Sequence, residues 1–396
     1  MIKLGVVGYG GRASNVIGEC FREISPDLKV VGVVDPDEAG VRERLAECDK
    51  KDVVFYADLA AMVSHASLDG LLIGTRCNLH TPLAIEAASY DLPLYLEKPV
   101  AITMEQAHAL EKAYENARCP VVVSFPLRVS PLCLKSREMI EQGAVGEAVH
   151  IAALNYVPYG HGYWERPYRD YSITGGLMLQ KATHDLDYMA YVMGSPIVRV
   201  AAMGTFGRVY GGTKASGLRC DNCDETLTCR ESPRNRARAG LLDDGDDGIH
   251  PCNFSVDCGN IETGTNEDAS SVLVEFATGV HGIYTQVFFT RRDAARRGAI
   301  ISGYEGTLDF DWYRNDMKYV RHFEQFSDTI AAGEGQSHFG GDYALSCDFI
   351  DIIEGNGTSR TPIEAGLQSV YACLAARESA LEGHFVDVAQ VGGTHP

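Results

Sequence analysis

The sequence predicts an α/β protein that begins with a doubly wound parallel sheet. Short apolar runs alternate with helical patterns over about the first 125 residues, as in parallel sheets covered by helices. The first apolar run ends in a glycine-rich turn, and past Arg128 the pattern changes to strands of alternating polarity. The 396 residues suffice for two cores, so we place domains at residues 1–125 and 126–396.

Composition excludes several classes of protein. A hydrophobic content of 45% and a charged content of 22% are typical of a soluble globular chain. The formal net charge of -19 repels a phosphate backbone, so we expect no nucleic-acid partner. No apolar stretch approaches the ~18 residues of a membrane span, and the opening MIKLGVVGYG lacks the features of a signal peptide. We expect a cytoplasmic protein without a membrane partner, with most of its 12 cysteines as reduced thiols.

The glycine turn predicts a dinucleotide site. The apolar run 2–7 leads into the spacing G-x-G-x-x-A and then into a helical pattern. Gly8 permits the tight turn, Gly10 lets a pyrophosphate approach the backbone, and Ala13 lets helix and strand pack closely. The N–H groups at the helix start then face the phosphates. The expected contact residues are Gly8, Tyr9, Gly10, Gly11, Arg12 and Ala13.

The second apolar run, 30–34, ends in Asp35. A carboxylate here accepts hydrogen bonds from the adenosine ribose and repels a 2'-phosphate, which favours NAD over NADP. Arg12, Arg42 and Arg44 lie near enough in sequence to keep NADP open as the alternative.

The alternation continues to the end of the first domain, and the strand ends carry polar residues. We expect helices at 39–48, 59–64, 82–90 and 104–117 and strands at 70–74, 93–96 and 121–125. Ligands bind at the carboxyl ends of such strands, where Thr75, Arg76, Glu97, Lys98, Pro99 and Arg128 fall. Lys98 is therefore expected beside a nicotinamide; the alternative is a surface lysine before a turn.

The stretch 175–191, GGLMLQKATHDLDYMAY, is expected to form one helix that carries the chemistry. At helical spacing Gln180, His184, Asp187 and Tyr188 share one side, with Lys181 next to them. A histidine with polar neighbours one turn away on either side can serve as acid or base. The alternative is a core helix whose histidine only satisfies a buried hydrogen bond.

Taken together, these motifs resemble the glucose-fructose oxidoreductase, inositol dehydrogenase and MocA (GFO/IDH/MocA) family. The resemblance rests on the glycine turn, on 75–80, on Glu97-Lys98-Pro99, on 125–131 ahead of 143–146, and on Gly175-Gly176 ahead of His184 and Asp187. It implies an N-terminal Rossmann domain and a C-terminal α+β domain whose open, mostly antiparallel sheet commonly forms an oligomer interface, here in a dimer or tetramer. It also implies hydride transfer between nicotinamide and a secondary alcohol of a sugar or polyol, with Lys98 and His184 at the reacting hydroxyl. The cofactor contacts expected beyond the glycine turn are Asp35, Thr75, Arg76, His80, Glu97, Lys98 and Arg128.

One position departs from that family. Polyol dehydrogenases of the family typically have an Asp four residues before the histidine, where this chain has Gln180, followed by Lys181. A neutral amide cannot stabilise a lysine ammonium or an imidazolium as a carboxylate does, so the proton transfers must differ. This keeps open an NAD-dependent glycosidase that oxidises C3, eliminates the aglycone, adds water and returns the hydride. It needs one more base at C2, for which Lys98, Lys181 or Tyr163 is a candidate. A non-catalytic dinucleotide sensor is the third hypothesis.

The loop 158–174 is rich in aromatic residues and leads directly into the predicted helix. Aromatic rings stack on sugar faces, which predicts a substrate wall; the alternative is a loop that its aromatics hold against the domain. Arg291, Arg292, Arg296 and Arg297 form a basic cluster, either a solvated sheet edge or a recognition site for an anionic substituent. The substrate contacts we expect are Trp164, Arg166, Asp187 and His338, with Asp342 as a further candidate.

A polar, irregular insertion at about residues 217–266 interrupts the second domain. Cys220, Cys223, Cys229 and Cys252 could hold a structural zinc ion, with Cys258 as a fifth candidate for four places. Free thiols are the next interpretation and a disulfide the last. The acidic run 243–247 is expected to be a solvated turn.

The remaining elements of the second domain follow from periodicity. We expect strands at 147–156, 198–206, 271–276, 282–289 and 298–302, and helices at 134–142, 341–353 and 363–381.

Overall fold

The computed structural model describes residues 1–165, 167–240, 250–258, 266–331 and 337–393. Its first sheet has six parallel strands in the order β3-β2-β1-β4-β5-β6. The strands are β1 (Lys3–Val7), β2 (Lys29–Val34), β3 (Val54–Phe55), β4 (Gly70–Ile73), β5 (Leu94–Leu96) and β6 (Val121–Val123). Their nearly continuous apolar composition fits strands that are covered on both faces. The predicted parallel sheet is confirmed, and only the two-residue β3 was missed.

Helices cover both faces of this sheet. The helix after the glycine turn consists of α1 (Gly11–Asn15), a π-helical segment (Val16–Phe21) and α2 (Arg22–Ile24). The predicted helix at 39–48 is two short helices, α3 (Glu38–Arg44) and α4 (Glu47–Lys50). The others are α5 (Leu59–His65), α6 (Cys77–Ala87) and α7 (Met104–Tyr114).

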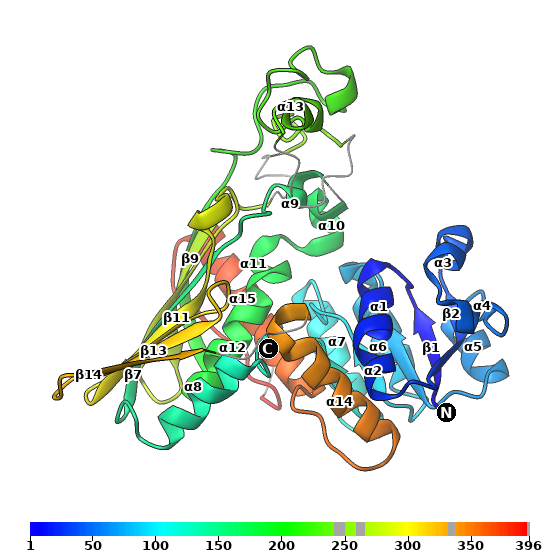
Figure 1. Ribbon diagram of the computed structural model, residues 1–396, viewed down its shortest axis with the longest axis horizontal. Helices are drawn as coiled ribbons and strands as arrows, with labels where there is room; N and C mark the ends of the chain where they lie inside the picture. Colours follow the sequence, from blue (N-terminus) through cyan, green and yellow to red (C-terminus); the bar gives the residue numbers. More distant parts are fainter. Residues whose placement is uncertain (166, 241–249, 259–265, 332–336, 394–396) are drawn as a thin grey trace.

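One helix from the C-terminal part of the chain also covers the first sheet. Helix α14 (Gly341–Ile353) lies beside α1 and α2, and its Leu345 and Phe349 are buried in the same apolar cluster as Val6 and Phe21 (Figure 1). The chain thus returns to its first domain, so a single boundary at residue 125 separates the sheets but not all of the helices. This return brings residues near 340 to the carboxyl ends of the first strands.

The second sheet has nine strands in the order β14-β13-β12-β11-β7-β10-β9-β8-β15. Every pair is antiparallel except β7 with β10. This confirms the open, mostly antiparallel sheet that the family resemblance implies. The strands are β7 (Ala148–Tyr156), β8 (Ile197–Thr205), β9 (Ala269–Phe276), β10 (His281–Val287), β11 (Arg296–Gly303), β12 (Gly306–Asp311), β13 (Asp316–Arg321), β14 (Phe326–Ala331) and β15 (Val386–Asp387). The strands expected from the sequence did not include β12, β13, β14 or the two-residue β15.

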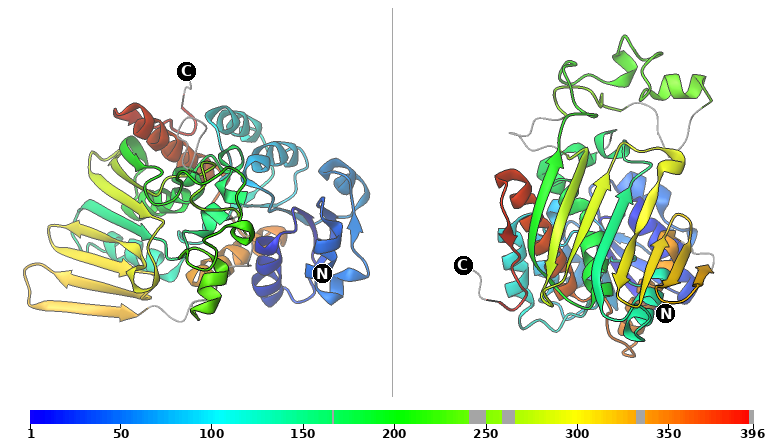
Figure 2. Two further views of the ribbon diagram at one scale, coloured as in Figure 1. Left: turned by 90° about the horizontal axis from the view of Figure 1, so that it is seen from above. Right: turned by 90° about the vertical axis from the view of Figure 1, so that its left-hand side faces the viewer.

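Only one face of the second sheet carries helices. Figure 2 shows α8 (Pro131–Glu141), α12 (Ala182–Met193) and α15 (Ile363–Glu382) behind the sheet and a bare face in front. The burial of β9 alternates accordingly: Val272 and Val274 are 1% exposed, whereas Leu273 between them is 47% exposed. The core of this domain therefore lies between the helices and the inner sheet face.

The stretch expected to form one helix is broken in two. α11 (Leu177–Gln180) ends at Lys181, whose φ of -106° departs from helical geometry, and α12 starts at Ala182. Glu267 accepts hydrogen bonds from the N–H groups of Leu177 (2.8 Å) and Met178 (3.3 Å) and so caps α11. Because of the break, Gln180 and His184 lie in different helices rather than on one continuous face.

The cysteine-rich insertion projects beyond the end of the second sheet, at the top of Figure 1. Its described part includes a 3-10 turn (Cys220–Asn222) and α13 (Pro233–Arg238). An aromatic cluster of Trp164, Tyr210 and Phe288 packs below it. The acidic run 243–247 lies outside the described residues. The short elements not yet named are α9 (Gly162–Glu165), α10 (Tyr171–Thr174) and 3-10 turns at Pro167–Arg169, Arg292–Ala294 and Ser337–Gly340.

Candidate active site

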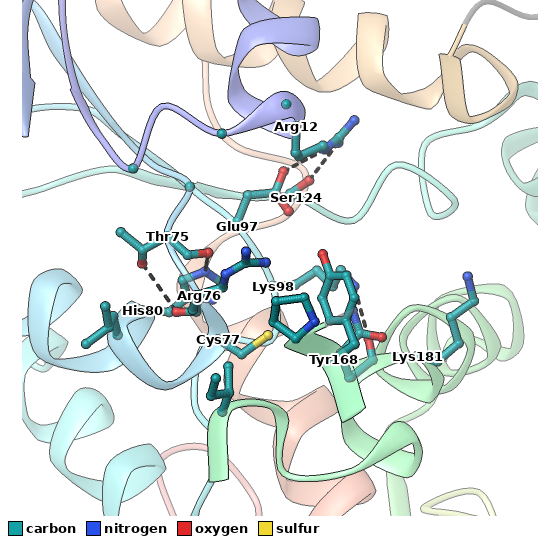
Figure 3. Close-up of a pocket in the computed structure, with 18 of the residues that line it drawn as sticks. Arg12, Thr75, Arg76, Cys77, His80, Glu97, Lys98, Ser124, Tyr168 and Lys181 are labelled. Carbon is teal, nitrogen blue, oxygen red and sulfur yellow. Dashed lines mark hydrogen bonds and ion pairs between the residues drawn. The ribbon is translucent and has the colours of Figure 1, made fainter. Parts of the chain in front are cut away.

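A single cavity of about 760 Å³ runs between the two domains along the carboxyl ends of the parallel strands. Its lining includes Asp35, the glycine turn, the loop before α10, the α11–α12 break and β11. Figure 3 shows Arg12, Glu97 and Lys98 of the first domain together with Tyr168 and Lys181 of the second. The cavity-lining residues include Gly8, Gly10, Gly11, Arg12, Asp35, Thr75, Arg76, Cys77, His80, Glu97, Lys98, Tyr159, Tyr163, Tyr168, Gln180, Lys181, His184, Arg297 and His338.

The glycine turn leaves an open cradle. Gly8 has a φ of +82°, and a Cβ added there would lie 2.7 Å from the backbone nitrogen of Thr75. A Cβ added at Gly10 or Gly11 would meet nothing within 4 Å, so these two positions border free space in the cavity. Tyr9 and Ala13 are each 1% exposed and pack in the core instead of lining the cavity. At Gly10 and Gly11 the turn therefore presents backbone to the free space of the cavity.

Asp35 holds the outer end of the cavity in shape. Its Oδ2 accepts a hydrogen bond from the Tyr9 N–H (2.8 Å), and its Oδ1 accepts one from the Asp37 N–H (2.8 Å). Each carboxylate oxygen has a further lone pair for a ribose hydroxyl. Arg44 Nε donates to the Tyr9 carbonyl (3.2 Å), and its Nη2 lies 3.4 Å from Asp37, which keeps this arginine at the same end of the site.

Arg12 connects the glycine turn to two other parts of the chain. Its guanidinium donates to Glu97 Oε1 (2.8 Å) and makes a bidentate pair with Asp342 of α14 (2.6 and 2.7 Å). Arg12 and His338 hold the pKa of Asp342 far below its usual range against the effect of burial. His338 Nδ1 is 2.7 Å from the same carboxylate. Arg12 and Asp342 thus fix the orientation of Glu97, next to Lys98, and of His338.

Lys98 reaches across to the second domain. Its Nζ donates to the backbone carbonyl of Gln180 (2.9 Å). Burial lowers the pKa of this lysine to about 8, and the positive charges of Lys181 and Arg297 contribute in the same direction. His80 contacts the carbonyls of Pro99 (2.8 Å) and Thr75 (3.1 Å), so it supports the turn that carries Lys98. A lysine with a pKa near 8 can exchange a proton at neutral pH.

His184 faces the same cavity from α12. It is 7% exposed, and burial together with the nearby charge of Lys98 lowers the pKa of its imidazole well below the usual value. The ring is therefore neutral at pH 7. Within the described residues its Nδ1 and Gln180 Oε1 are buried and make no hydrogen bond to the protein. His184 thus lines the cavity as a neutral imidazole, the form that can accept a proton.

Lys181 and Tyr159 form a second pair on the cavity wall. Lys181 Nζ donates to the Tyr159 hydroxyl (2.8 Å) and lies 5.6 Å from the centre of the Tyr163 ring. Burial raises the pKa of the Tyr159 phenol, but Lys181 and Arg297 overcome this effect and lower the pKa to about 8. Burial raises the pKa of Tyr163 above its usual value. The two tyrosines of one loop thus differ in acidity.

The basic cluster does not form an anion site. Arg297 is 3% exposed and binds Asp185 through Nε (3.0 Å) and Nη2 (2.8 Å). Arg291 pairs with Glu231, and Arg296 pairs with Asp309. Of these arginines, Arg297 alone is among the cavity-lining residues that the structure describes. The hypothesis that the cluster recognises an anionic substituent is corrected, because carboxylates from α12, β12 and the insertion already neutralise three of its members.

Three further predicted contacts lie off the cavity wall. Asp187 is 3% exposed and binds Arg128 (Nε to Oδ2, 3.0 Å), so it ties α12 to the segment before α8. Arg128 is thereby turned away from the cofactor position we expected. Trp164 is 2% exposed and stacks within the aromatic cluster under the insertion. The roles of Asp187, Arg128 and Trp164 are structural in this arrangement, because none of the three is among the cavity-lining residues that the structure describes. Arg166 lies outside the described residues.

The cysteines of the insertion approach one another without closing into a metal site. The N–H of Cys220 donates to the His250 carbonyl (3.0 Å) and the N–H of Cys252 to the Leu218 carbonyl (2.8 Å), which pairs the two ends of the insertion. All 12 cysteines are free thiols. Among the residues described, no three of these sulfur atoms lie within 4.8 Å of one another; His161, Glu165 and Glu231 do bring three ligand atoms that close. The four-cysteine zinc site stays a prediction.

The sequence analysis did not single out three contributors to the site. Tyr159 and Tyr168 come from the aromatic loop, where six other aromatic or basic side chains carried the same signal. Arg297 was expected to belong to the basic cluster at a sheet edge or an anion site, but in β11 its side chain points inward and is 3% exposed. Only the folded loop distinguishes a tyrosine on the cavity wall from one in the core.

Comparisons with known proteins define the class. The family model described as oxidoreductase family, NAD-binding Rossmann fold (GFO/IDH/MocA) matches residues 2–125, and the model of the GFO/IDH/MocA C-terminal domain matches residues 133–309. The chain therefore belongs to the GFO/IDH/MocA family, and its residues 2–125 are the NAD-binding Rossmann domain of that family. Within the described residues, no helix has the length and apolar character needed to cross a membrane.

The relatives include polyol enzymes. Myo-inositol 2-dehydrogenase of Thermotoga maritima is 24% identical over 207 residues, which are 52% of this chain and 58% of that protein. The rhizopine catabolism protein MocA of Rhizobium meliloti is 27% identical over 229 residues, 56% of this chain and 68% of that protein. The match thus spans less than two thirds of the inositol dehydrogenase.

Solved structures share the whole fold. A levoglucosan dehydrogenase in complex with NADH and L-sorbose has a TM-score of 0.74 at 19% identity and covers 99% of this chain and 100% of its own. An NAD binding oxidoreductase from Klebsiella pneumoniae has a TM-score of 0.73 at 20% identity, with 98% and 99% covered. At this level of identity the likeness shows the fold alone.

Proposed function

We propose that the protein is an NAD-dependent dehydrogenase that oxidises a secondary hydroxyl of a sugar, glycoside or polyol. One observation carries this proposal: Lys98 from the first domain and a neutral His184 from the second line the same cavity as the open glycine turn. The inositol dehydrogenases among the relatives support the substrate class.

The residues present fit NAD. The free space beside Gly10 and Gly11 lets a pyrophosphate approach the backbone, and Asp35 at the outer end suits an unphosphorylated ribose. Arg44 at the same end is the feature that would serve NADP, but it already contacts Tyr9 and Asp37. When bound, NAD supplies the hydride acceptor for the reaction.

The protein's part in the reaction is to move one proton and to stabilise one charge. Neutral His184 accepts the proton of the reacting hydroxyl, and the ammonium of Lys98 stabilises the negative charge that develops on the oxygen. Gln180 occupies the position at which polyol dehydrogenases of the family typically have an Asp. Because a neutral amide does not stabilise the ammonium of Lys98 as a carboxylate would, the pKa of Lys98 stays low, at about 8. Tyr159, Tyr163 and Tyr168 on the cavity wall supply faces and hydroxyls that suit a sugar ring.

A panel assay tests this function. Purified enzyme with NAD is mixed with inositols, neutral hexoses, uronic acids and p-nitrophenyl glycosides, and NADH and p-nitrophenol are followed together. NADH accumulation with at least one sugar or polyol is the expected result. Failure of every compound to reduce NAD, in protein shown to bind NAD, would contradict the proposal and favour the non-catalytic sensor.

A second candidate is an NAD-dependent glycosidase that oxidises C3 only transiently, for neutral or anionic glycosides. The Tyr159–Lys181 pair favours it, because elimination needs a base beyond the one that takes the hydroxyl proton. In the panel assay it would release p-nitrophenol without net NADH, which separates it from the dehydrogenase.

The bare face of the second sheet supports a homo-oligomer. Met203 on β8 is 79% exposed and Leu273 on the neighbouring β9 is 47% exposed; the two are diagonal neighbours, since Met203 pairs with Ser271 and Leu273 with Ala201, and their exposure is high for apolar side chains on a sheet. We propose that the same face of a second copy covers them in a dimer or tetramer. Light scattering should report an oligomer for the wild type and a monomer for Met203→Asp combined with Leu273→Asp.

A zinc ion at Cys220, Cys223, Cys229 and Cys252 remains our proposal for the insertion. Burial and the charges of Cys252, Cys229, Glu165 and Cys223 raise the pKa of the Cys220 thiol to about 12, which supports mutual proximity of the four side chains. A divalent cation would relieve that repulsion and draw the sulfurs together. Metal analysis should find one zinc per chain, lost in Cys220→Ser and in Cys223→Ser. The free thiols also support a reducing compartment such as the cytoplasm.

A further inference from the structure

The pair of Lys181 and Tyr159 has no task in the hydride-transfer chemistry of Lys98 and His184. Lys181 is 6% exposed, and its ammonium points at the Tyr159 hydroxyl over 2.8 Å. The same ammonium lies 4.9 Å from the centre of the Tyr159 ring, so side chain and ring are held in one geometry. Both residues line the cavity together with Lys98 and His184. A second acid–base couple therefore faces the space where the substrate binds.

The charges around Tyr159 all favour its ionised form. Lys181 comes from the break between α11 and α12, and Arg297 comes from β11; both are cationic and both lower the pKa of the phenol to about 8 after the opposing effect of burial. The other two titratable groups that face it are the neutral phenols of Tyr163 and Tyr313, whose pKa values burial raises. The largest effects on the Tyr159 pKa thus come from burial, Lys181, Arg297 and Tyr313, and not from a carboxylate.

The tyrosine is also accessible. Tyr159 is 38% exposed although its hydroxyl is held by a buried lysine, whereas Trp164 and Phe288 of the same region are fully buried. A base that removes a proton from a bound molecule needs this combination of a fixed position and an open side. Lys98 enters the same cavity from the first domain, and its ammonium can stabilise negative charge on an oxygen.

We propose that Tyr159, held by Lys181, removes a carbon-bound proton next to the ketone that oxidation creates, so that the enzyme catalyses enolisation in addition to hydride transfer. This inference rests on the proposed function, because oxidation supplies the ketone that acidifies the neighbouring C–H bond. The phenolate oxygen takes the proton, the C–H electron pair becomes the C=C bond of an enolate, and the carbonyl electron pair moves to the oxygen beside Lys98. Return of the proton reverses the step, and no oxidant or reductant is consumed.

The consequence depends on the substituent beside the new C=C bond. In a glycoside oxidised at C3, the enolate at C2 can expel the group on C1, which leaves with the C–O electron pair and takes a proton from water. In a free polyol without a leaving group, the enolate can only be reprotonated. Proton exchange is therefore the activity common to both, and it can be measured without knowing the natural substrate.

The test uses a ketone supplied directly, so that it does not depend on hydride transfer. NAD-loaded full-length enzyme is incubated in D2O with methyl 3-keto-α-D-glucopyranoside or methyl 3-keto-α-D-galactopyranoside, and deuterium at C2 and C4 is followed by NMR against an enzyme-free control. We expect exchange well above that control, with an apparent pKa near 8 for the base. Tyr159→Phe should lose at least ~100-fold of the rate, as expected for loss of a general base.

Three variants separate catalysis from structure. Tyr304→Phe removes the same hydroxyl from a tyrosine that is 74% exposed and absent from the cavity lining, and it should exchange at the wild-type rate. Lys181→Met should move the pH profile of exchange up by about 1 unit or more, because the cation that favours the phenolate is lost, whereas Lys181→Arg should keep the profile near its original pH. Circular dichroism and NAD binding establish that each variant is folded.

The outcomes distinguish this inference from the proposed function. No exchange above the enzyme-free rate with either ketone overturns the enolisation proposal, and so does wild-type exchange in Tyr159→Phe. If the panel of alcohols still reduces NAD in that case, the dehydrogenase proposal stands without it. If exchange occurs but no alcohol reduces NAD, the dehydrogenase proposal fails and the enolisation activity stands by itself.

Discussion

The two walls of the cavity are built in different ways. The first-domain wall consists of short turns that follow parallel strands, and its charges are matched: Arg12 binds Glu97 and Asp342, and Asp35 is held by backbone N–H groups. The second-domain wall combines a loop, a helix break and a strand, and its titratable groups include the cations Lys181 and Arg297 and the phenols of the loop tyrosines. The pKa values of Lys98 and Lys181, one on each wall, show how the two environments differ. Burial lowers the pKa of Lys98 to about 8, whereas nearby tyrosines raise the pKa of Lys181 above its usual value.

We expect the first-domain wall to hold the cofactor and to contribute Lys98 to the reaction, whereas the second-domain wall contributes the other groups that can exchange protons. Matched charges and open glycines hold a cofactor in a constant position, whereas a neutral imidazole and a coupled lysine–tyrosine pair can exchange protons near neutral pH. The following predictions test this division, beginning with the largest expected effect.

The buried ion pair of Asp185 and Arg297, which supports the second-domain wall, should be essential for folding. Asp185 is 0% exposed and binds Arg297, and it also accepts hydrogen bonds from Asn155 Nδ2 (3.0 Å) and the Tyr284 hydroxyl (3.1 Å). Asp185→Ala leaves a buried guanidinium without its counter-charge, so the free energy of unfolding should fall by about 3–5 kcal/mol. Urea denaturation measures this, with Arg199→Ala on an exposed ion pair as the control. A loss below ~1 kcal/mol would show that the pair is not the support we infer.

Removing either reacting group should abolish most of the turnover. Lys98→Ala and His184→Ala should each lower kcat by at least ~100-fold with NAD still bound, because each removes a group that acts on the reacting oxygen. Steady-state kinetics on the best compound of the panel and an NAD titration by fluorescence measure the two effects separately. Near-normal turnover in either variant would remove that residue from the mechanism.

The cofactor wall should respond in binding more than in rate. Asp35→Ala removes the acceptor for a ribose hydroxyl and for the Tyr9 N–H, so the Kd for NAD should rise by roughly 10-fold, while NADP should gain relative to NAD. Titration of both dinucleotides into wild type and variant gives the ratio. An unchanged ratio would mean that Asp35 only shapes the turn.

A carboxylate at position 180 should shift the pH dependence. Without it, Lys98 loses its proton at about pH 8, so a rate that needs the ammonium should fall as the pH rises through that value. Gln180→Asp places a negative charge beside Lys98, which favours the ammonium and should move the alkaline limb of kcat/KM up by about 1 unit. The acid limb, set by His184, should lie below pH 6.5 because the pKa of this imidazole is depressed. Gln180→Glu serves as the second carboxylate variant, and an unchanged profile in both would place Gln180 outside the proton path.

Much of the fold followed from local pattern. Alternating strands and helices gave the parallel sheet, because each βα unit repeats the same periodicity within about 30 residues. Strands β13 and β14 were missed since exposed polar residues such as Asp328 and Thr329 hide the alternation on which strand prediction depends. The helix at 175–191 was predicted unbroken, because the 3.6-residue period continues through Lys181 in sequence even though the backbone turns there.

The sequence by itself determined the family, the glycine turn, the position of Asp35 and the identities of Lys98 and His184, because each depends on residues adjacent in the chain. Only the tertiary structure decided which tyrosine of the loop faces the cavity, that Asp187 binds Arg128, that Asp342 returns to Arg12, and that carboxylates neutralise most of the basic cluster. Apart from Arg296 and Asp309, which are 13 residues apart, these partners lie about 60 to 330 residues apart in sequence. The acidity of Lys98 and Tyr159 arises from burial and from charges contributed by distant segments, and no local motif encodes that environment.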